Sequence, residues 1–425
     1  MLICSGLALA TTSFAESGNY FRVLPMEGKC YGISDNGKWI ISTKVSETSY
    51  LYNVDTEECI ELLTSQTPFC EAHDVSDDGM VVGVVSEQPA YYKDGEWHML
   101  DMPEGYDTGF CSKVSADGSV IYGNVGAGFY YAPVIWRDGV LENVNILAKD
   151  PFNKIPAGGY IVDQVSGDQS KMFGRVIDSQ YAWYPVCWEN GTPQHMFTDM
   201  FKSSNGQPNG YEMVSAQFSP NGRYIALDYQ EMSTTGGVHY AKLYDFKNDE
   251  MTDLDGELIC LVNDYKEAFS CSPASTLYRN AYVHFEDVTM TLENWLLSSY
   301  GLDLSTNEYL EYTGTPVGIS ADGKRIALLG VYEDVTLTYL LNLENRIGNG
   351  VNDNFQTVPT VISKNSRLHI CASANAAVSV YDITGRAVHE ATMGSNSTEI
   401  EVSKGTYVVR ILQEGSVHTY KTIVE

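Results

Sequence analysis

The sequence predicts an all-β chain in which one structural unit is repeated. One short motif recurs along the chain, as in VSDDGMVVG at Ser76 and VSADGSVIYG at Ser115. In this motif a serine is followed within three residues by an acidic or amide residue and then by glycine. Tyrosine is abundant, with 29 copies among 425 residues. Valine and isoleucine cluster around these turns without any long helical periodicity, and this texture favours strands over helices.

Further copies of the unit extend over most of the chain. They read ISDNGKWII at Ser34, VSGDQSKMFG at Ser166, FSPNGRYIA at Ser219 and ISADGKRIA at Ser320. Successive serines lie roughly 40 to 53 residues apart, except that Ser219 and Ser320 are separated by about twice that distance. We therefore expect a degenerate unit between these two, with CSPASTLY at Ser272 as the candidate, which makes seven units.

Each unit predicts a four-stranded meander. The Ser and Asp side chains can satisfy turn amides, and Asp-Gly or Asn-Gly permits a tight hairpin. A second hairpin follows in segments 90–100, 133–144 and 185–196. Because such a sheet has two apolar faces, it must pack against a neighbour on each side. The sequence therefore predicts a seven-bladed β-propeller over residues 16–345, in which a strand at about 19–26 completes the last blade.

The unit resembles the TolB-type and extracellular (HAF-like) propeller repeats, whose pattern is an apolar residue, Ser-x-Asp-Gly and an apolar strand. The similarity covers most of residues 20 to 345 and implies the propeller fold. It implies no single activity, since such propellers act as binding platforms, scaffolds and enzyme supports.

The N-terminus predicts a signal peptide over residues 1–15. An apolar run from Leu2 to Ala10 precedes the small-x-small pattern Ser13, Phe14, Ala15. The run is too short to cross a bilayer, and we expect no transmembrane segment. Eight cysteines remain after Ala15. Their even number permits disulfides, but they are scattered singly, so buried small hydrophobic side chains are the expected role.

A linker at 346–352 leads to residues 353–425, where six or seven short strands predict a small immunoglobulin-like β-sandwich. Its segments VYDITGRAV, SKGTYVVRI and KTIV resemble the C-terminal sorting domain of the bacterial type IX secretion system. The resemblance implies contact with the secretion machinery, export across an outer membrane, and release or attachment at the cell surface. An accessory sandwich without a sorting role is the alternative. The residues that carry the resemblance are Tyr381, Asp382, Gly385, Arg386, Gly405, Tyr407 and Lys421.

One segment predicts a helix. In TLENWLLSSYG, Thr291 is the expected N-cap and Gly301 the stop, with Trp295 on the apolar stripe that packs against the propeller. An exposed Trp295 that binds a ligand is the alternative.

The chemistry of the chain argues against several function classes. A formal net charge of −29 disfavours nucleic acid as a partner. No HExxH, GxSxG, P-loop or dinucleotide-binding motif occurs, and the eight histidines are not closely spaced, so we expect no cofactor, no metal site and no catalytic residues. The segment FRVLP at Arg22 has one residue more than the similar sialidase motif. A propeller-based glycosidase or lyase stays open as an alternative.

The sequence favours a secreted or surface-located, non-catalytic propeller that binds a glycan or an extracellular protein. A purely structural surface protein is a further alternative. Flat aromatic rings beside carboxylates suit sugar rings or apolar side chains. Such residues occur in the loops between second and third strands and in nearby connections, which should share one face of the ring. The candidate ligand-binding residues are Tyr106, Phe129, Tyr130, Asp178, Tyr181, Trp183 and Tyr211.

Overall fold

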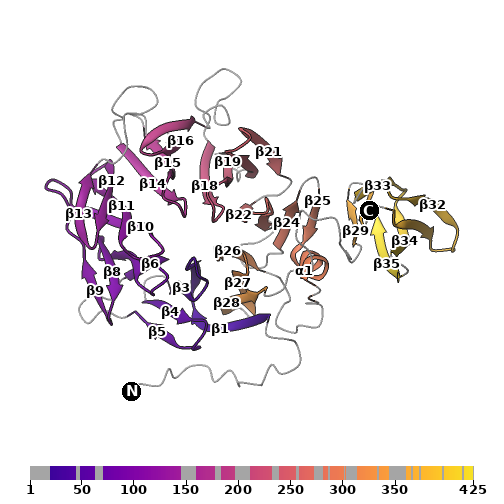
Figure 1. Ribbon diagram of the computed structural model, residues 1–425, viewed down its shortest axis with the longest axis horizontal. Coiled ribbons are helices and arrows are strands. Elements are labelled where there is room, and N and C mark those ends of the chain that lie inside the picture. Colours follow the sequence, from indigo (N-terminus) through magenta and orange to yellow (C-terminus); the bar gives the residue numbers. More distant parts are fainter. Residues whose placement is uncertain are drawn as a thin grey trace.

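The fold is a ring of small antiparallel sheets, with a separate unit of strands at the C-terminal end, as seen in a computed structural model (Figure 1). The all-β prediction is confirmed. The structure describes residues 20–44, 48–62, 70–144, 159–177, 183–196, 211–231, 239–254, 258–271, 281–285, 288–300, 302, 314–332, 335–343, 360–364, 367–372, 375–394, 397–413 and 416–424.

The first half of the ring contains four groups of four strands. They are β2 (Lys29–Ile33), β3 (Trp39–Lys44), β4 (Thr48–Asn53) and β5 (Cys59–Glu61); β6 (Cys70–Val75), β7 (Val81–Val85), β8 (Gln88–Lys93) and β9 (Glu96–Met99); β10 (Thr108–Val114), β11 (Val120–Ala127), β12 (Tyr130–Arg137) and β13 (Val140–Val144); β14 (Gly159–Val165), β15 (Lys171–Ile177), β16 (Trp183–Glu189) and β17 (Thr192–Met196). The third and fourth groups are joined into one sheet by a single parallel pairing of Tyr131 with Gly159.

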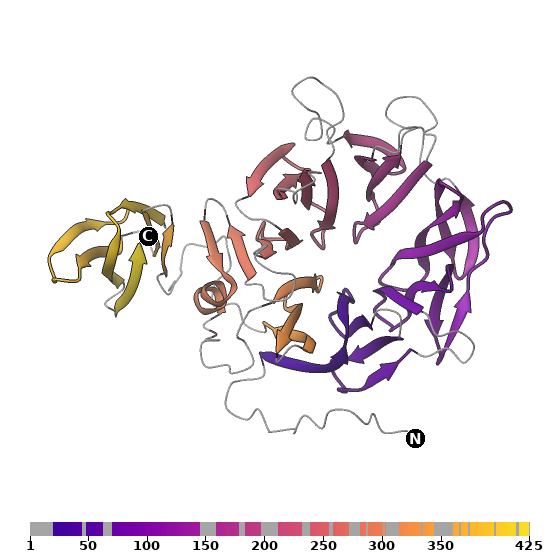
Figure 2. The same cartoon turned by 180° about the vertical axis from the view of Figure 1, so that it is seen from behind.

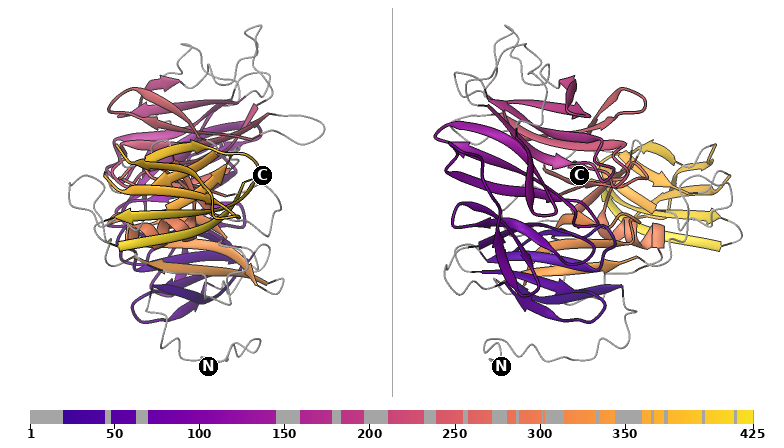
Figure 3. Two further views of the ribbon diagram at one scale, coloured as in Figure 1. Left: turned by 90° about the vertical axis from the view of Figure 1, so that its right-hand side faces the viewer. Right: turned by 60° about the vertical axis from the view of Figure 1, so that its left-hand side comes forward.

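The second half contains three more groups. They are β18 (Tyr211–Phe218), β19 (Tyr224–Glu231), β20 (His239–Asp245) and β21 (Glu250–Leu254); β22 (Leu258–Val262), β23 (Ala268–Cys271), β24 (Ala281–Phe285) and β25 (Val288–Thr291); β26 (Thr315–Ile319), β27 (Arg325–Tyr332), β28 (Val335–Asn342) and β1 (Phe21–Glu27). From the side, the strands cross the thickness of the ring (Figure 3).

The first and last strands of the ring share a sheet. Strand β1 pairs antiparallel with β28, with Phe21 opposite Leu341 and Leu24 opposite Thr338, and the two lie together in Figure 2. Leu24 and Met26 are each only 1% exposed and pack in a cluster with residues of β3 and β27. The N-terminal strand therefore contributes core to the sheets at both ends of the array.

The repeated serines build the turns between the first two strands in six of the seven groups. Ser115 Oγ donates to Asp117 Oδ1 at 2.7 Å and accepts from the Val120 amide at 2.9 Å. Gly118 completes this turn with a φ of +74°. Because the buried hydroxyl acts as both donor and acceptor, one side chain closes the turn. The same hydroxyl contacts recur at Ser34, Ser76, Ser166, Ser219 and Ser320.

The degenerate unit differs from the sequence-based prediction. Residues 272–280, which include Ser272, lie outside the described residues. The turn between β22 and β23 instead centres on Asn263, whose Oδ1 accepts from the amides of Tyr265 and Glu267, both at 3.0 Å. Lys266 takes the glycine position with a φ of +64°. An amide side chain replaces the serine hydroxyl because it can also accept from turn amides and donate to a neighbour.

The predicted helix is confirmed as α1 (Leu292–Tyr300). The Asn294 amide donates to Thr291 Oγ1 at 3.3 Å, as expected for an N-cap. Trp295 is only 2% exposed and its Nε1 donates to Glu267 Oε1 at 3.0 Å. Trp295 is therefore a packing residue rather than an exposed binding residue.

The C-terminal unit consists of two sheets around a separate core. Its strands are β29 (Thr360–Lys364), β30 (Arg367–Cys371), β31 (Ala377–Asp382), β32 (Ala387–Thr392), β33 (Ser397–Glu401), β34 (Gly405–Gln413) and β35 (Ser416–Val424). One sheet has the order β29-β30-β33 and the other β32-β31-β34-β35. Val378, Val380, Val409 and Ile411 are almost completely buried between them.

The described cysteines whose side chains are placed form no disulfide. Cys30, Cys70, Cys111, Cys187 and Cys271 are buried. Burial raises the thiol pKa of both Cys30 and Cys111 to about 12. These thiols stay protonated and pack as small hydrophobic groups, as expected. Among the helices in the described part of the chain, none is long and apolar enough to cross a membrane.

Candidate functional site

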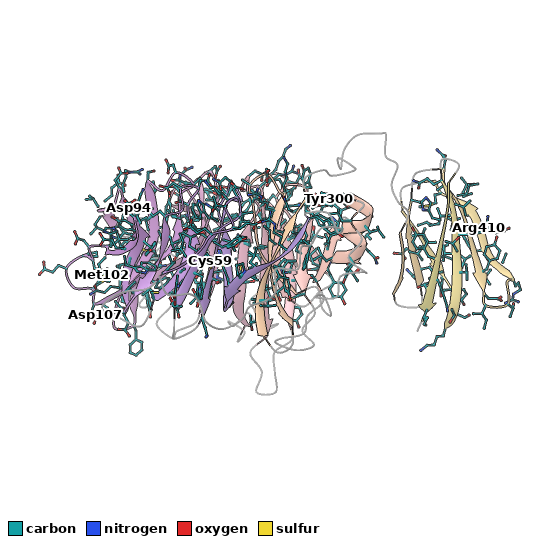
Figure 4. All side chains as sticks on the ribbon, turned by 90° about the horizontal axis from the view of Figure 1, so that it is seen from below. Cys59, Asp94, Met102, Asp107, Tyr300 and Arg410 are labelled. Atoms are coloured by element: carbon teal, nitrogen blue, oxygen red, sulfur yellow. The ribbon has the colours of Figure 1, made fainter. Side chains whose placement is uncertain are left out.

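A cavity of about 250 Å³ lies between the innermost strands of the ring. Its wall is formed by residues of β2, β6, β10, β14, β18 and β26, together with several of the serine-led turns. The serine turns and the second hairpins lie on one face of the ring, where Figure 4 labels Asp94. Met102 and Asp107, in a connection between two groups of strands, lie on the other face.

A β-bulge shapes each innermost strand. In all seven groups, the register between the first and second strands skips one residue of the first. The skipped residues include Tyr31, His73, Ser112 and Val317, and all four line the cavity. Bulges bend a strand and re-aim side chains. The same backbone feature thus presents a different side chain to the cavity from each of these sheets.

Three polar side chains in the cavity wall make no hydrogen bond within the described part of the chain. They are Tyr31, Gln164 and Gln217, from three different sheets. Each is partly buried. Burial raises the pKa of the Tyr31 hydroxyl, and the nearby Glu71 carboxylate adds to the rise, so the group is a neutral donor at physiological pH. Polar groups in such positions normally bond to water or to a ligand.

An acidic corner adjoins these groups. Asp74 Oδ2 accepts from the Val114 amide at 3.0 Å, and its Oδ1 lies 3.4 Å from Lys113 Nζ. Desolvation, followed by the nearby carboxylates of Asp74 and Asp77, raises the pKa of Asp35. The positive charge of Lys113 lowers the pKa of Asp35 and so opposes these effects. Asp74 and Lys113 thus compensate each other, while the Asp35 carboxylate is available to accept from a ligand.

His73 bridges two neighbouring sheets beside this corner. Its Nδ1 donates to the Cys111 carbonyl at 2.7 Å, and its Nε2 lies 3.5 Å from Glu71 Oε2. The ring stands edge-on to Phe110, with the ring centroids 6.0 Å apart. The hydrogen bond from His73 lowers the pKa of the Glu71 carboxyl. These contacts fix the orientation of the imidazole in the wall.

Arginines do not gather at the cavity in the described residues. Each of seven makes an ion pair with a carboxylate outside it, and Arg22 pairs with Glu57 at 3.0 Å. A sialidase-like arginine cluster is therefore not formed by these residues. Within the same part of the chain, no three His, Cys, Asp or Glu side chains are grouped to hold a metal ion.

The aromatic residues predicted to bind a ligand are brought together only in part. Tyr106 and Tyr130 are half-buried and pack against one core cluster, near enough that Tyr106 contributes to the raised pKa of Tyr130. Phe129 projects from the turn between β11 and β12 with 76% of its surface exposed. Asp178 and Tyr181 lie outside the described residues. Trp183 and Tyr211 are the first residues of β16 and β18, and their side chains are not among those that the structure describes.

Sequence reasoning did not identify the cavity residues. Tyr31, His73, Gln164 and Gln217 stand two or three places before a repeated serine. These two offsets are the signal that could have found them, because they place each residue on an innermost strand, either at the bulge or after it.

The C-terminal unit places the residues of its predicted sorting motif at a turn and two strands. Asp382 Oδ1 accepts from the amides of Thr384 at 2.9 Å and Arg386 at 3.1 Å, and Gly385 has a φ of +83°. Val408 on β34 lies between Tyr381 on β31 and Lys421 on β35, and it pairs with both residues.

On β34, which begins at Gly405, the Tyr407 hydroxyl donates to the Ser403 carbonyl at 2.7 Å. Residues 364–425 match the family model described as the secretion system C-terminal sorting domain. This part of the chain is a sorting domain. The protein is accordingly exported, to the medium or the cell surface, and its sorting domain interacts with secretion machinery.

Comparison with curated protein sequences finds no match. Three solved structures are similar to the chain. TolB from Acinetobacter baumannii has 14% identity and a TM-score of 0.37, with 53% of each chain covered. A chain of the mitotic checkpoint complex has 10% identity and a TM-score of 0.47, with 81% of this chain and 97% of that chain covered. Oligogalacturonate lyase from Vibrio parahaemolyticus has 13% identity and a TM-score of 0.45, with coverages of 76% and 90%. The chain spans about half the length of the TolB structure.

Proposed function

We propose that this protein is an exported seven-bladed β-propeller that binds a glycan or protein ligand in the cavity between its innermost strands, without catalysis. Residues 16–345 form the propeller, and residues 353–425 form an immunoglobulin-like sandwich that carries the sorting signal. Residues 1–15 act as the signal peptide. The sharing of one sheet by β1 and β28 supports a closed ring.

The observation that carries the proposal is the set of polar groups in the cavity wall that make no hydrogen bond to any other described residue. Tyr31, Gln164 and Gln217 come from separate sheets and line one cavity. A few polar groups that converge on a concave site are typical of ligand-binding pockets. Because the groups are held by packed strands, binding orders few side chains and little conformational entropy is lost.

A glycan array probed with the full chain tests this function. We expect wild-type protein to bind at least one glycan and the Tyr31→Phe variant to bind it about two- to tenfold more weakly, since one hydrogen bond is lost. Tyr91→Phe is the matched control, because Tyr91 stacks on His98 in the outer strands of a neighbouring group, away from the cavity. Equal loss in both variants, or no effect of Tyr31→Phe, would contradict binding in the cavity.

A second candidate function follows from Asp35. A carboxyl whose pKa is raised and which faces a polar cavity is suited to general acid catalysis, as in glycosidases and lyases. Hydrolysis or elimination assays on the glycans bound in the array test this alternative. Turnover by wild-type protein that disappears in Asp35→Asn would favour an enzyme, and binding without turnover favours the non-catalytic function.

A further inference from the structure

One position of the repeat contributes four polar side chains to the cavity wall. The residue two places before the serine, which we call the minus-two position, lies on the innermost strand just before the turn. Six of its seven occupants line the cavity. Leu261, which precedes the turn residue Asn263, is the seventh and is completely buried in the core. The occupants in chain order are Gly32, Asp74, Lys113, Gln164, Gln217, Leu261 and Gly318.

The neighbouring positions of the repeat are chemically constant. The residue directly before the turn residue is always apolar, and the turn residue itself is serine in six units and asparagine in one. The apolar residues give the cavity wall a constant apolar component, and the turn residues close the turn in every unit. The minus-two position has the same place in each strand, yet its side chain differs from unit to unit. Variation at this place therefore changes the chemistry of the cavity wall from one sheet to the next.

The occupants divide the ring into two arcs. Asp74, Lys113, Gln164 and Gln217 come from four consecutive groups of strands and form a polar arc. The next three groups supply only Leu261, Gly318 and Gly32. A Cβ added at Gly32 would have only Asp74 Oδ1 within 4 Å, at 3.9 Å, so the space in front of this glycine is open.

The polar arc carries little net charge. Lys113 Nζ lies 3.4 Å from Asp74 Oδ1, so the two charges compensate each other. The two glutamines add neutral amides, each with donors and an acceptor. A cavity of about 250 Å³ is smaller than the roughly 300–1,000 Å³ typical of sites for drug-sized ligands, which limits the occupant to about one sugar ring.

We infer that the minus-two positions select the ligand, and that the ligand is an uncharged sugar residue. Its hydroxyl groups contact the polar arc, and its C–H face lies over Gly32, the glycine with open space in front of it. This inference rests on the proposed function and names its ligand class. A terminal sugar of a glycan fits this arrangement, whereas a uronic acid would place its carboxylate beside Asp35 and Asp74.

Calorimetric titration with a panel of monosaccharide methyl glycosides tests the polar arc. The panel contains neutral sugars together with glucuronide and glucosaminide. We expect wild-type protein to prefer a neutral sugar, and Gln164→Ala with Gln217→Ala to weaken its binding about 10- to 100-fold, the effect of two lost hydrogen bonds. Gln88→Ala, an exposed glutamine on β8, is the matched control and should leave affinity unchanged.

A change in preference tests selection more sharply than a loss of affinity. Asp74→Asn keeps an oxygen that can accept from the Val114 amide but leaves Lys113 uncompensated. We expect this variant to bind the glucuronide about tenfold better, relative to the neutral sugar, than wild-type protein does. Lys113→Gln should shift the preference toward the glucosaminide. Both shifts are ratios of two affinities, so reduced stability alone would not produce them.

The failure of this inference is distinguishable from failure of the proposed function. If the protein binds a glycan on the array and no minus-two substitution changes its affinity for that glycan, the inference is overturned and glycan binding remains. Wild-type preference for the glucuronide overturns the neutral class. Absence of binding to every glycan overturns the inference together with the glycan form of the proposed function, and it leaves a protein as the ligand.

Discussion

Replacement of Leu24 by alanine tests whether β1 is an integral part of the ring. The Leu24 side chain is 1% exposed and packs in one cluster with Ile40 of β3 and Leu340 of β28. A buried Leu→Ala change costs about 3–5 kcal/mol when the site cannot collapse. Total stabilities are about 5–15 kcal/mol, so this one change removes a large fraction. At roughly 2–4 °C per kcal/mol, we expect Tm to fall by about 6–20 °C.

Differential scanning calorimetry measures this change, with Leu51→Ala as the matched control. Leu51 is 3% exposed and lies on β4, within a sheet formed by one continuous segment of chain. If β1 belongs to the ring, the two variants lose similar stability. A Leu24→Ala variant that melts with the wild type while Leu51→Ala melts early would refute the reasoning, because β1 would then be detached in solution.

Four further predictions concern the turns, the helix and the sorting domain. Ser115→Ala should lower the free energy of unfolding in urea by about 1–2 kcal/mol, since a turn amide and a carboxylate both lose their partner; an unchanged midpoint would contradict this. Hydrogen bonds from Ser115 and the following residues lower the pKa of Asp117 to about 2. The stability it contributes is therefore complete above about pH 4 and lost as pH falls toward 2, and Asp117→Asn should show weaker acid dependence by circular dichroism. Trp295→Phe should lower the free energy of unfolding by about 1–3 kcal/mol in the same urea assay, because Glu267 loses a buried donor. An unchanged free energy of unfolding would contradict a stabilising role for this hydrogen bond. Gly385→Val places a β-branched residue at positive φ in the sorting domain, so cell fractionation should show less exported protein at equal synthesis, and normal export would contradict a role for this turn.

The serine-led turns could be predicted because their chemistry is local. Ser, Asx and Gly at fixed offsets satisfy one another within six residues, and the contacts at Ser115 and Ser320 are of this kind. The unit at Asn263 was misplaced because asparagine performs the serine's role and Lys266 that of the glycine. A search for the hydroxyl could not find it, whereas a search for any side chain that both donates and accepts would have done so.

The cavity was not predicted because its residues share a place in the repeat but no chemistry. Gln164, Gln217 and Tyr31 resemble ordinary strand residues, and only the bulge decides that they face inward. The ligand-binding role of the aromatic residues named from the sequence stays a prediction. Tyr106 and Tyr130 are largely engaged in packing, which no composition argument separates from ligand contact.

The Gly32→Leu variant provides the most direct test of ligand binding in the cavity. An isobutyl group at this position would extend into open space beside Asp74, at a residue that lines the cavity and whose φ is not positive. Gly394→Leu in the sorting domain, where a Cβ also meets nothing within 4 Å, is the matched control. We predict that Gly32→Leu loses binding to the array glycan at least tenfold with an unchanged Tm, while Gly394→Leu binds normally. Full affinity in a folded Gly32→Leu variant would show that the ligand binds elsewhere.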